Sequence, residues 1–252
     1  NFLLFFSKEI AIISTFFLGY FFYNRKVFFQ ALVLTLFGLI VAAFLKSFFK
    51  IPLLPHLGEG WSFPSGHMFT AVTFWGYLAL ELRGKVISIL IACLLIGIGC
   101  ALVYCNYHVF VDVLAAAFFS FILVTLYRIL LNVTQLDKKR ELFSFVFFIF
   151  SCLLIYFTHP FKSVFYIPLG ALSGLSVGSC LEKIPFFSKS PYFLIEFCLC
   201  LAGFVLIYYL IPYLDNSILS GRLLTYFLLG LWLAFGPKFL VAFLKPLRKK
   251  NG

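Results

Sequence analysis

The sequence contains few charged residues and no long polar stretch. Of its 252 residues, 63% are hydrophobic and only 12% are charged, and the mean hydropathy is +1.07. Soluble globular domains have about 25% charged residues, so the composition excludes that class. A helix that crosses a membrane needs roughly 20 apolar residues, and many such runs occur here. We therefore expect a polytopic membrane protein.

The sequence also lacks any cysteine spacing typical of a disulfide framework or a zinc site. Its seven cysteines fall within or at the ends of apolar runs, where they are interpreted as small hydrophobic residues. No metal site and no cofactor are expected. The cysteines are Cys93, Cys100, Cys105, Cys152, Cys180, Cys198 and Cys200.

The apolar runs predict an all-α fold, a bundle of about nine transmembrane helices. The polar segment DKKR divides the first five helices, within residues 1–136, from four C-terminal helices within 141–252. Gly170, Gly174 and Gly178 recur every four residues, which indicates close helix packing and not a site. The expected spans are roughly 10–23, 27–45, 64–82, 86–105, 107–128, 142–158, 163–181, 191–211 and 221–244.

Basic residues outnumber acidic ones, 20 to 9, for a net charge of +11. In a membrane protein this excess is typical of cytoplasmic loops, so no nucleic-acid partner is expected. One set of loops carries fourteen basic residues and the opposite set five, which predicts an outer N-terminus and a cytoplasmic C-terminus. The larger set is Arg25, Lys26, Arg83, Lys85, Arg128, Lys138, Lys139, Arg140, Lys183, Lys189, Lys245, Arg248, Lys249 and Lys250. The smaller set is Lys8, Lys46, Lys50, Lys162 and Arg222, and Lys238 lies within the last expected helix.

Three polar clusters fall on the predicted outer side. Lys46 ends a long apolar helix, PSGH at 64–67 precedes another, and His108 and Asp112 lie four residues apart at a helix start. Each alone has a structural explanation: a lysine at the membrane interface, a helix cap, and a polar pair sealing a helix end. Ionisable groups at membrane helices are nevertheless functional candidates.

Together the clusters have the components of a phosphoryl-transfer site. Ser65 and Gly66 precede a helix, whose N-terminal amides can bind an anion, and Lys46 adds positive charge. His108 is the candidate nucleophile, and Asp112 would hold its ring in one tautomer. His67 is the candidate acid that protonates the leaving oxygen.

These residues resemble the signatures of the type 2 phosphatidic acid phosphatase superfamily, which are K-x-x-x-x-x-x-R-P, P-S-G-H and S-R-x-x-x-x-x-H-x-x-x-D. The second signature is intact at residues 64–67, and the end of the third is intact at His108 and Asp112. Their order and spacing also fit the family, and the resemblance covers roughly residues 10–130. It implies a phosphatase-like core of about five helices.

Both family arginines are missing. The Arg-Pro of the first signature falls on Leu53 and Leu54, and the Ser-Arg of the third falls on Ala101 and Leu102. Arginine grips phosphate with two donors in a way that lysine does not copy. Lys50, one turn beyond Lys46, is the candidate that compensates in part, and Tyr104, Asn106 and Tyr107 are others.

The resemblance implies an integral membrane phosphatase that acts on a lipid phosphate or diphosphate at the outer face through a phospho-histidine intermediate. Nine spans with an outer N-terminus also resemble the arrangement of glucose-6-phosphatase. Two alternatives stay open. One is a lipid phosphotransferase similar to the sphingomyelin or inositol-phosphorylceramide synthases, and the other is a non-catalytic lipid-binding member.

The charge asymmetry makes a prediction about topology. In a background without the seven native cysteines, Lys139→Cys should react with a membrane-impermeant maleimide only from the cytoplasmic side. Leu57→Cys should react only from the outer side. The reverse labelling pattern would place the site in the cytoplasm and contradict the outer-face assignment.

Overall fold

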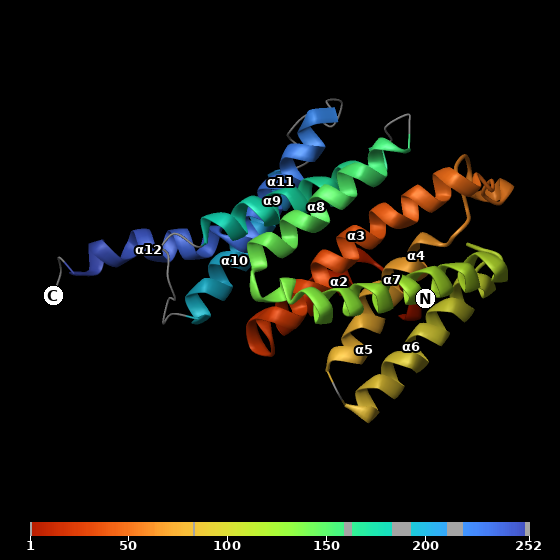
Figure 1. Ribbon diagram of the computed structural model, residues 1–252, viewed down its shortest axis with the longest axis horizontal. Coiled ribbons are helices and arrows are strands. Elements are labelled where there is room, and N and C mark those ends of the chain that lie inside the picture. The colour runs from red at the N-terminus through yellow and green to blue at the C-terminus, as the bar shows by residue number, and fades with distance from the viewer. Residues whose placement is uncertain (1, 83, 159–162, 183–192, 211–218, 250–252) are drawn as a thin grey trace. The chain divides into compact units, whose positions relative to one another are not determined.

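The computed structural model describes residues 2–82, 84–158, 163–182, 193–210 and 219–249, and most of them are helical (Figure 1). Within these ranges there is no strand, only an isolated antiparallel bridge between Pro52 and Trp61. The all-α expectation is therefore confirmed. Some basic residues counted above, including Arg83, Lys162, Lys183, Lys189 and Lys250, lie outside the described residues.

Helices occupy the positions of all the expected spans, with small differences at their ends. The helices are α1 Phe2–Phe5, α2 Glu9–Phe22, α3 Arg25–Phe49, α4 Gly66–Ala71, α5 Tyr77–Glu81, α6 Lys85–Tyr104, α7 Phe110–Thr134, α8 Arg140–Tyr156, α9 Tyr166–Leu181, α10 Phe193–Leu210, α11 Leu219–Ala234 and α12 Gly236–Lys249.

The count of nine spans is not confirmed. Among the described residues, α3, α6 and α7 are long and apolar enough to cross a membrane, and α11 with α12 would make a fourth if that pair, bent by 54°, is one span. Helix α2 has 14 residues, or about 21 Å at 1.5 Å per residue, against a hydrocarbon layer of about 30 Å.

Two expected spans are interrupted helices. The run at 64–82 contains a π-helical segment, Val72–Gly76, between α4 and α5. The run at 221–244 bends between α11 and α12. Hydropathy could not detect these interruptions, because the residues at both of them are apolar.

The chain forms two compact units, Asn1–Gln135 with Leu154–Pro160, and Leu136–Leu153 with Phe161–Gly252. In the first unit α3 is the central helix, packed against α2, α4, α5 and α7. The apolar window of α3 is 72% buried, against 17% in α6 and 28% in α7. The exposed apolar side chains of α6 and α7 are suited to contact with lipid.

A buried polar cluster joins three helices of the first unit. The Tyr77 hydroxyl donates to Oε1 of Gln30 at 2.8 Å, and the Tyr127 hydroxyl donates to the Gln30 carbonyl at 2.8 Å. Arg128, the residue after Tyr127, donates from Nε to Oε1 of Glu81 at 2.9 Å. These bonds fix α7 against α3 and α5, so the helices that carry the signatures are held in register.

In the second unit, α9 and α11 approach each other closely along glycines. A Cβ added at Gly174 would lie 2.0 Å from the carbonyl oxygen of Phe227, and one at Gly230 would lie 2.3 Å from that of Ala171. The interpretation of the glycine stripe as a packing surface is confirmed. Glu182, which follows α9, pairs with Arg140 at the start of α8 and with Lys238 in α12.

The glycine contacts predict the effect of one methyl group. Gly174→Ala should force α9 and α11 apart and lower the free energy of unfolding by about 1–3 kcal/mol, as overpacking does. Gly76→Ala is the matched control, because its Cβ would lie 3.5 Å from Val72 Cγ1, an ordinary contact. Thermal unfolding in detergent measures both, and equal transitions for the two variants would contradict the close approach.

Candidate active site

His108 and Asp112 form a buried hydrogen-bonded pair. Nδ1 of His108 lies 3.2 Å from Oδ2 of Asp112, and the two residues are 7% and 3% exposed. A carboxylate only accepts hydrogen bonds, so Nδ1 carries the proton and donates it. The lone pair of His108 is therefore on Nε2, the nitrogen that a nucleophile would use.

The turn between α6 and α7 positions this histidine. Asn106 has a left-handed backbone with φ of 56°, and the N–H groups of Tyr107 and His108 donate to the Leu102 carbonyl at 3.1 and 3.3 Å. These bonds close the end of α6 in the manner of a helix C-cap. Val109 is the N-cap of α7, so Asp112 falls in the first turn of that helix.

The backbone of Ser65 connects the PSGH segment to this pair. Ser65 is fully buried, and its N–H donates to the carbonyl oxygen of Asp112 at 3.1 Å. Its hydroxyl accepts from the Met68 N–H at 3.5 Å and caps α4. The Ser65 amide is thus engaged within the protein. Gly66 and His67 are the first two residues of α4, and the first amides of a helix have no partner within it.

Lys46, the remaining polar cluster, lies beside the PSGH segment. Its Nζ donates to the Trp61 carbonyl at 2.8 Å, which fixes the ammonium in the loop that precedes PSGH. A Cβ added at Gly66 would lie 4.0 Å from Lys46 Cε, so the lysine stem passes beside the start of α4. Its charge acts on both His67 and His108. Helices α3, α4 and α7, which pack on one another (Figure 1), thus supply one site.

The surroundings favour the neutral form of His108. Burial lowers the pKa of His108 from its ordinary value, and the positive charge of Lys46 lowers it further, while the hydrogen bond and charge of Asp112 oppose both effects. With a lowered pKa the ring stays neutral at physiological pH and loses its Nε2 lone pair only as the pH falls through that pKa.

Two of the predicted site residues, His67 and Lys50, are exposed. His67, at the second position of α4, is exposed, and the charge of a protonated His108 acts on its ring. Lys50 is the exposed left-handed C-cap of α3. The structure therefore brings Lys46, Ser65, Gly66, His67, His108 and Asp112 together.

The positions of the family arginines are occupied by residues that serve the local fold. Leu102 is 2% exposed, and its carbonyl closes the turn before His108. Leu53 lies against its own loop, with its N–H donating to the Gly60 carbonyl at 3.0 Å. His56, in the same loop, donates from Nε2 to the Asn106 carbonyl at 3.0 Å and so joins that loop to the turn before His108.

Lys8 was not singled out from the sequence, although its charge also acts on His67. It is the N-cap residue of α2. The sequence contained no motif that connects it with the histidines. The one signal in the sequence was that Lys8 belongs to the smaller of the two sets of basic residues.

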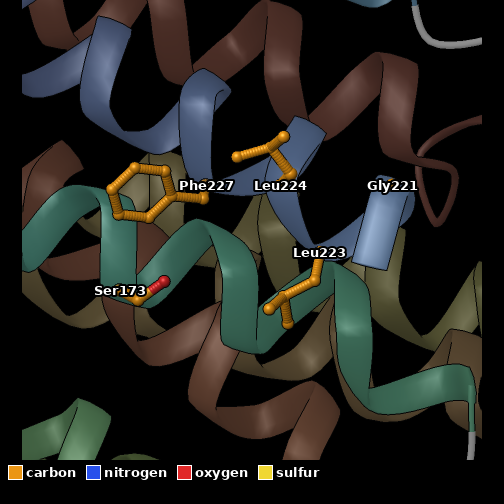
Figure 2. A pocket seen from close by; sticks show the side chains of 5 residues that line it. All are labelled: Ser173, Gly221, Leu223, Leu224 and Phe227. Atoms are coloured by element: carbon orange, nitrogen blue, oxygen red, sulfur yellow. The ribbon is translucent and has the colours of Figure 1, made fainter. Parts of the chain in front are cut away.

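A cavity of about 360 Å³ lies in the second unit, lined by Ser173, Gly221, Leu223, Leu224 and Phe227 (Figure 2). Ser173 supplies the one polar side chain of this lining, and its hydroxyl donates to the Gly170 carbonyl at 2.8 Å. The described residues that line this cavity therefore include no group suited to catalysis, whereas all the candidate catalytic residues belong to the first unit. Among the described residues, no group of three His, Cys, Asp or Glu side chains could hold a metal ion.

The fold and the site define a class of protein: an all-α membrane protein with a histidine–carboxylate pair and a lysine beside a helix start. The model of the PAP2 superfamily matches residues 48–135. The resemblance to the type 2 phosphatidic acid phosphatase superfamily is thereby confirmed over the segment that carries PSGH, His108 and Asp112. No curated protein and no solved structure matches the chain.

The charges around His108 predict the effects of two lysine substitutions. Lys46→Met removes a positive charge that acts on the ring, so the pKa of His108 should rise. Lys50→Met should leave it unchanged and serves as the matched control. Nitrogen chemical shifts of labelled histidine, followed against pH in detergent micelles, measure both. Equal shifts in the two variants would contradict the placement of Lys46.

Proposed function

We propose that the protein is a membrane phosphatase that hydrolyses a lipid phosphate or diphosphate through a phospho-histidine intermediate. The observation that carries the proposal is the buried His108–Asp112 pair, in which Nδ1 faces the carboxylate and the lone pair is on Nε2. Membership of the PAP2 superfamily supports a phosphatase-like or related lipid-modifying function.

In the first step, the lone pair of His108 Nε2 forms a bond to phosphorus, and the bond from phosphorus to the leaving oxygen breaks. His67 gives its proton to that oxygen, and the negative charge of the substrate favours the protonated form of His67. Asp112 stabilises the positive charge that develops on the His108 ring.

In the second step, water attacks phosphorus as His67 takes back a proton. The nitrogen–phosphorus bond then breaks, and inorganic phosphate leaves. Lys46, together with the Gly66 and His67 amides, neutralises charge on the phosphoryl oxygens in both steps. Both nucleophile and acid are side chains of the protein, so we propose that the reaction needs no metal.

Charge and composition support the proposed substrate and the proposed side of the membrane. A lipid phosphate is held in the bilayer that surrounds the exposed apolar helices α6 and α7. The fourteen-to-five division of basic residues supports a site on the outer face and a cytoplasmic C-terminus. The partners proposed are therefore the lipid bilayer and its phosphorylated lipid.

A phosphotransferase is the second candidate, and the leucines at positions 53 and 102 favour it, because those family members also lack the full arginine pattern. The same phospho-histidine would then pass its phosphoryl group to an acceptor hydroxyl in place of water. An assay of lipid phosphates with and without an acceptor alcohol distinguishes the two. Release of inorganic phosphate without acceptor supports the phosphatase, and product only with acceptor supports transfer.

The two histidines should respond differently to the leaving group. His67→Ala should slow hydrolysis of a lipid phosphate about 10²-fold or more, as loss of a general acid does. With nitrophenyl phosphate, whose leaving group needs little protonation, His67→Ala should recover part of its rate. His108→Ala should lose activity on both substrates, because no phospho-enzyme forms.

The control for this experiment is His56→Ala, which removes an exposed hydrogen bond to the Asn106 carbonyl. It should change turnover by only a few fold, which is the effect of one ordinary hydrogen bond. Full activity in His108→Ala would refute the mechanism. Equal losses on both substrates in His67→Ala would show that His67 binds the substrate without donating a proton.

A further inference from the structure

Three phenylalanine rings from three different segments meet beside the candidate site. The ring of Phe49 contacts that of Phe63 edge to face, with centroids 4.9 Å apart, and its centroid lies 6.1 Å from that of Phe119. Phe49 belongs to α3, Phe63 to the loop before α4 and Phe119 to α7. We call these three residues the aromatic cluster. It joins the same three parts of the chain that supply the site.

Each ring follows or precedes a site residue at a short spacing. Phe49 lies three residues after Lys46 on α3, and Phe119 lies seven residues after Asp112 on α7. Spacings of three and seven place two side chains on one face of a helix. Phe63 directly precedes the PSGH segment. The aromatic cluster is therefore on the faces of α3 and α7 that carry the site.

Backbone hydrogen bonds on both sides of Phe63 fix its place. One residue before it, the Ser62 N–H donates to the Ile51 carbonyl at 2.8 Å. Two residues after it, the Ser65 N–H donates to the Asp112 carbonyl at 3.1 Å. The second bond joins the segment that carries Phe63 to the residue that orients the candidate nucleophile. The backbone of Phe63 is therefore held beside the site before any ligand binds.

The aromatic cluster leaves ring surface available for a ligand. Phe49 is 39% exposed, and Phe63 and Phe119 are half-buried. Rings that served only as core would be buried, as Phe69 and Phe74 are at 0% exposed in the same unit. The outer surface of the aromatic cluster is therefore open to a ligand that also reaches the site.

The aromatic cluster and the site lie at different depths along α7. Asp112 is in the first turn of this helix, which is long and apolar enough to cross a membrane. Phe119 is seven residues further along, or about 10 Å at 1.5 Å per residue. Because Asp112 is at one end of the span, Phe119 lies deeper in the hydrocarbon layer. A phosphorylated lipid has the same order, with its charge at the membrane surface and its chain inside.

We propose that the aromatic cluster binds the first part of the hydrocarbon chain of the substrate, while Lys46 and the start of α4 bind its phosphate. The inference rests on the proposed function for the reaction, and it names the substrate class as a phosphate ester with a long hydrocarbon chain. A small water-soluble ester, such as a sugar phosphate, has no group that would contact the rings. In a membrane, recognition of a chain depends on close packing, which rigid rings provide.

The test compares two non-hydrolysable ligands with the same headgroup, hexadecylphosphonate and ethylphosphonate. Phosphorus NMR titrations of the purified protein in detergent micelles measure their affinities. Phe49→Ala should weaken hexadecylphosphonate binding about fivefold or more, because the chain loses its packing against the central ring. It should leave ethylphosphonate binding within about twofold, the scale of an effect without a lost contact. Farnesylphosphonate in a third arm distinguishes a prenyl chain from an alkyl chain by which of the two binds more tightly.

Phe121→Ala is the matched control. Phe121 is 61% exposed on the same helix, and it lies nine residues from Asp112, about two and a half turns, and so on the opposite face. It should bind hexadecylphosphonate as tightly as the unchanged protein. An equal loss of affinity in Phe121→Ala would show a general contact with the micelle and overturn the assignment. Equal weakening of both ligands in Phe49→Ala would show a distorted phosphate site and also overturn it.

A second variant, Phe119→Ala, covers failure of Phe49→Ala to fold, judged by thermal unfolding and gel filtration. It removes a ring from the other helix and should give the same loss that depends on the chain. Unchanged hexadecylphosphonate affinity in these variants, or no binding of that ligand by the unchanged protein, would overturn the proposal. Phosphonate binding requires no turnover. Binding without hydrolysis of the matching lipid phosphate would therefore refute the phosphatase and leave the assignment of the aromatic cluster in place.

Discussion

Asp112 is the residue on which the geometry of the site depends, because it holds two signatures at once. Its carboxylate accepts from Nδ1 of His108, and its carbonyl oxygen accepts from the Ser65 N–H. The first bond sets the tautomer of the proposed nucleophile. The second fixes the start of α4, and therefore His67, relative to that nucleophile. A backbone bond is independent of side-chain identity, so the two functions of this residue are separable by substitution of the carboxylate.

Much of this site was predictable from the sequence, because the spacing of four residues between His108 and Asp112 on a helix dictates their contact. The capping role of Ser65 followed from its place before Gly66. The bond from the Ser65 amide to Asp112 was not predictable, since it joins segments 47 residues apart and involves no side chain. It also removes one of the two amides that the sequence had offered for anion binding.

Other features were beyond the sequence for similar reasons. The hydrogen bond from Trp75 Nε1 to the Phe6 carbonyl joins residues 69 positions apart, and no local pattern encodes it. Lys50 follows Lys46 by one helical turn, but the helix ends there in a left-handed C-cap. The all-α class followed directly from composition, whereas the π-helical segment and the bend between α11 and α12 did not, because they leave the apolar pattern intact.

The hydrogen bond from Lys46 to the Trp61 carbonyl fixes the direction of the ammonium group. A free lysine side chain loses about 1.5–2 kcal/mol of rotamer freedom when it is fixed in place. Here that loss is taken during folding, because the loop before PSGH already orients the ammonium. One of its three N–H donors is committed to the loop, and the other two define a fixed direction. Under the proposed function, the phosphate would therefore meet an ammonium that the loop has already oriented.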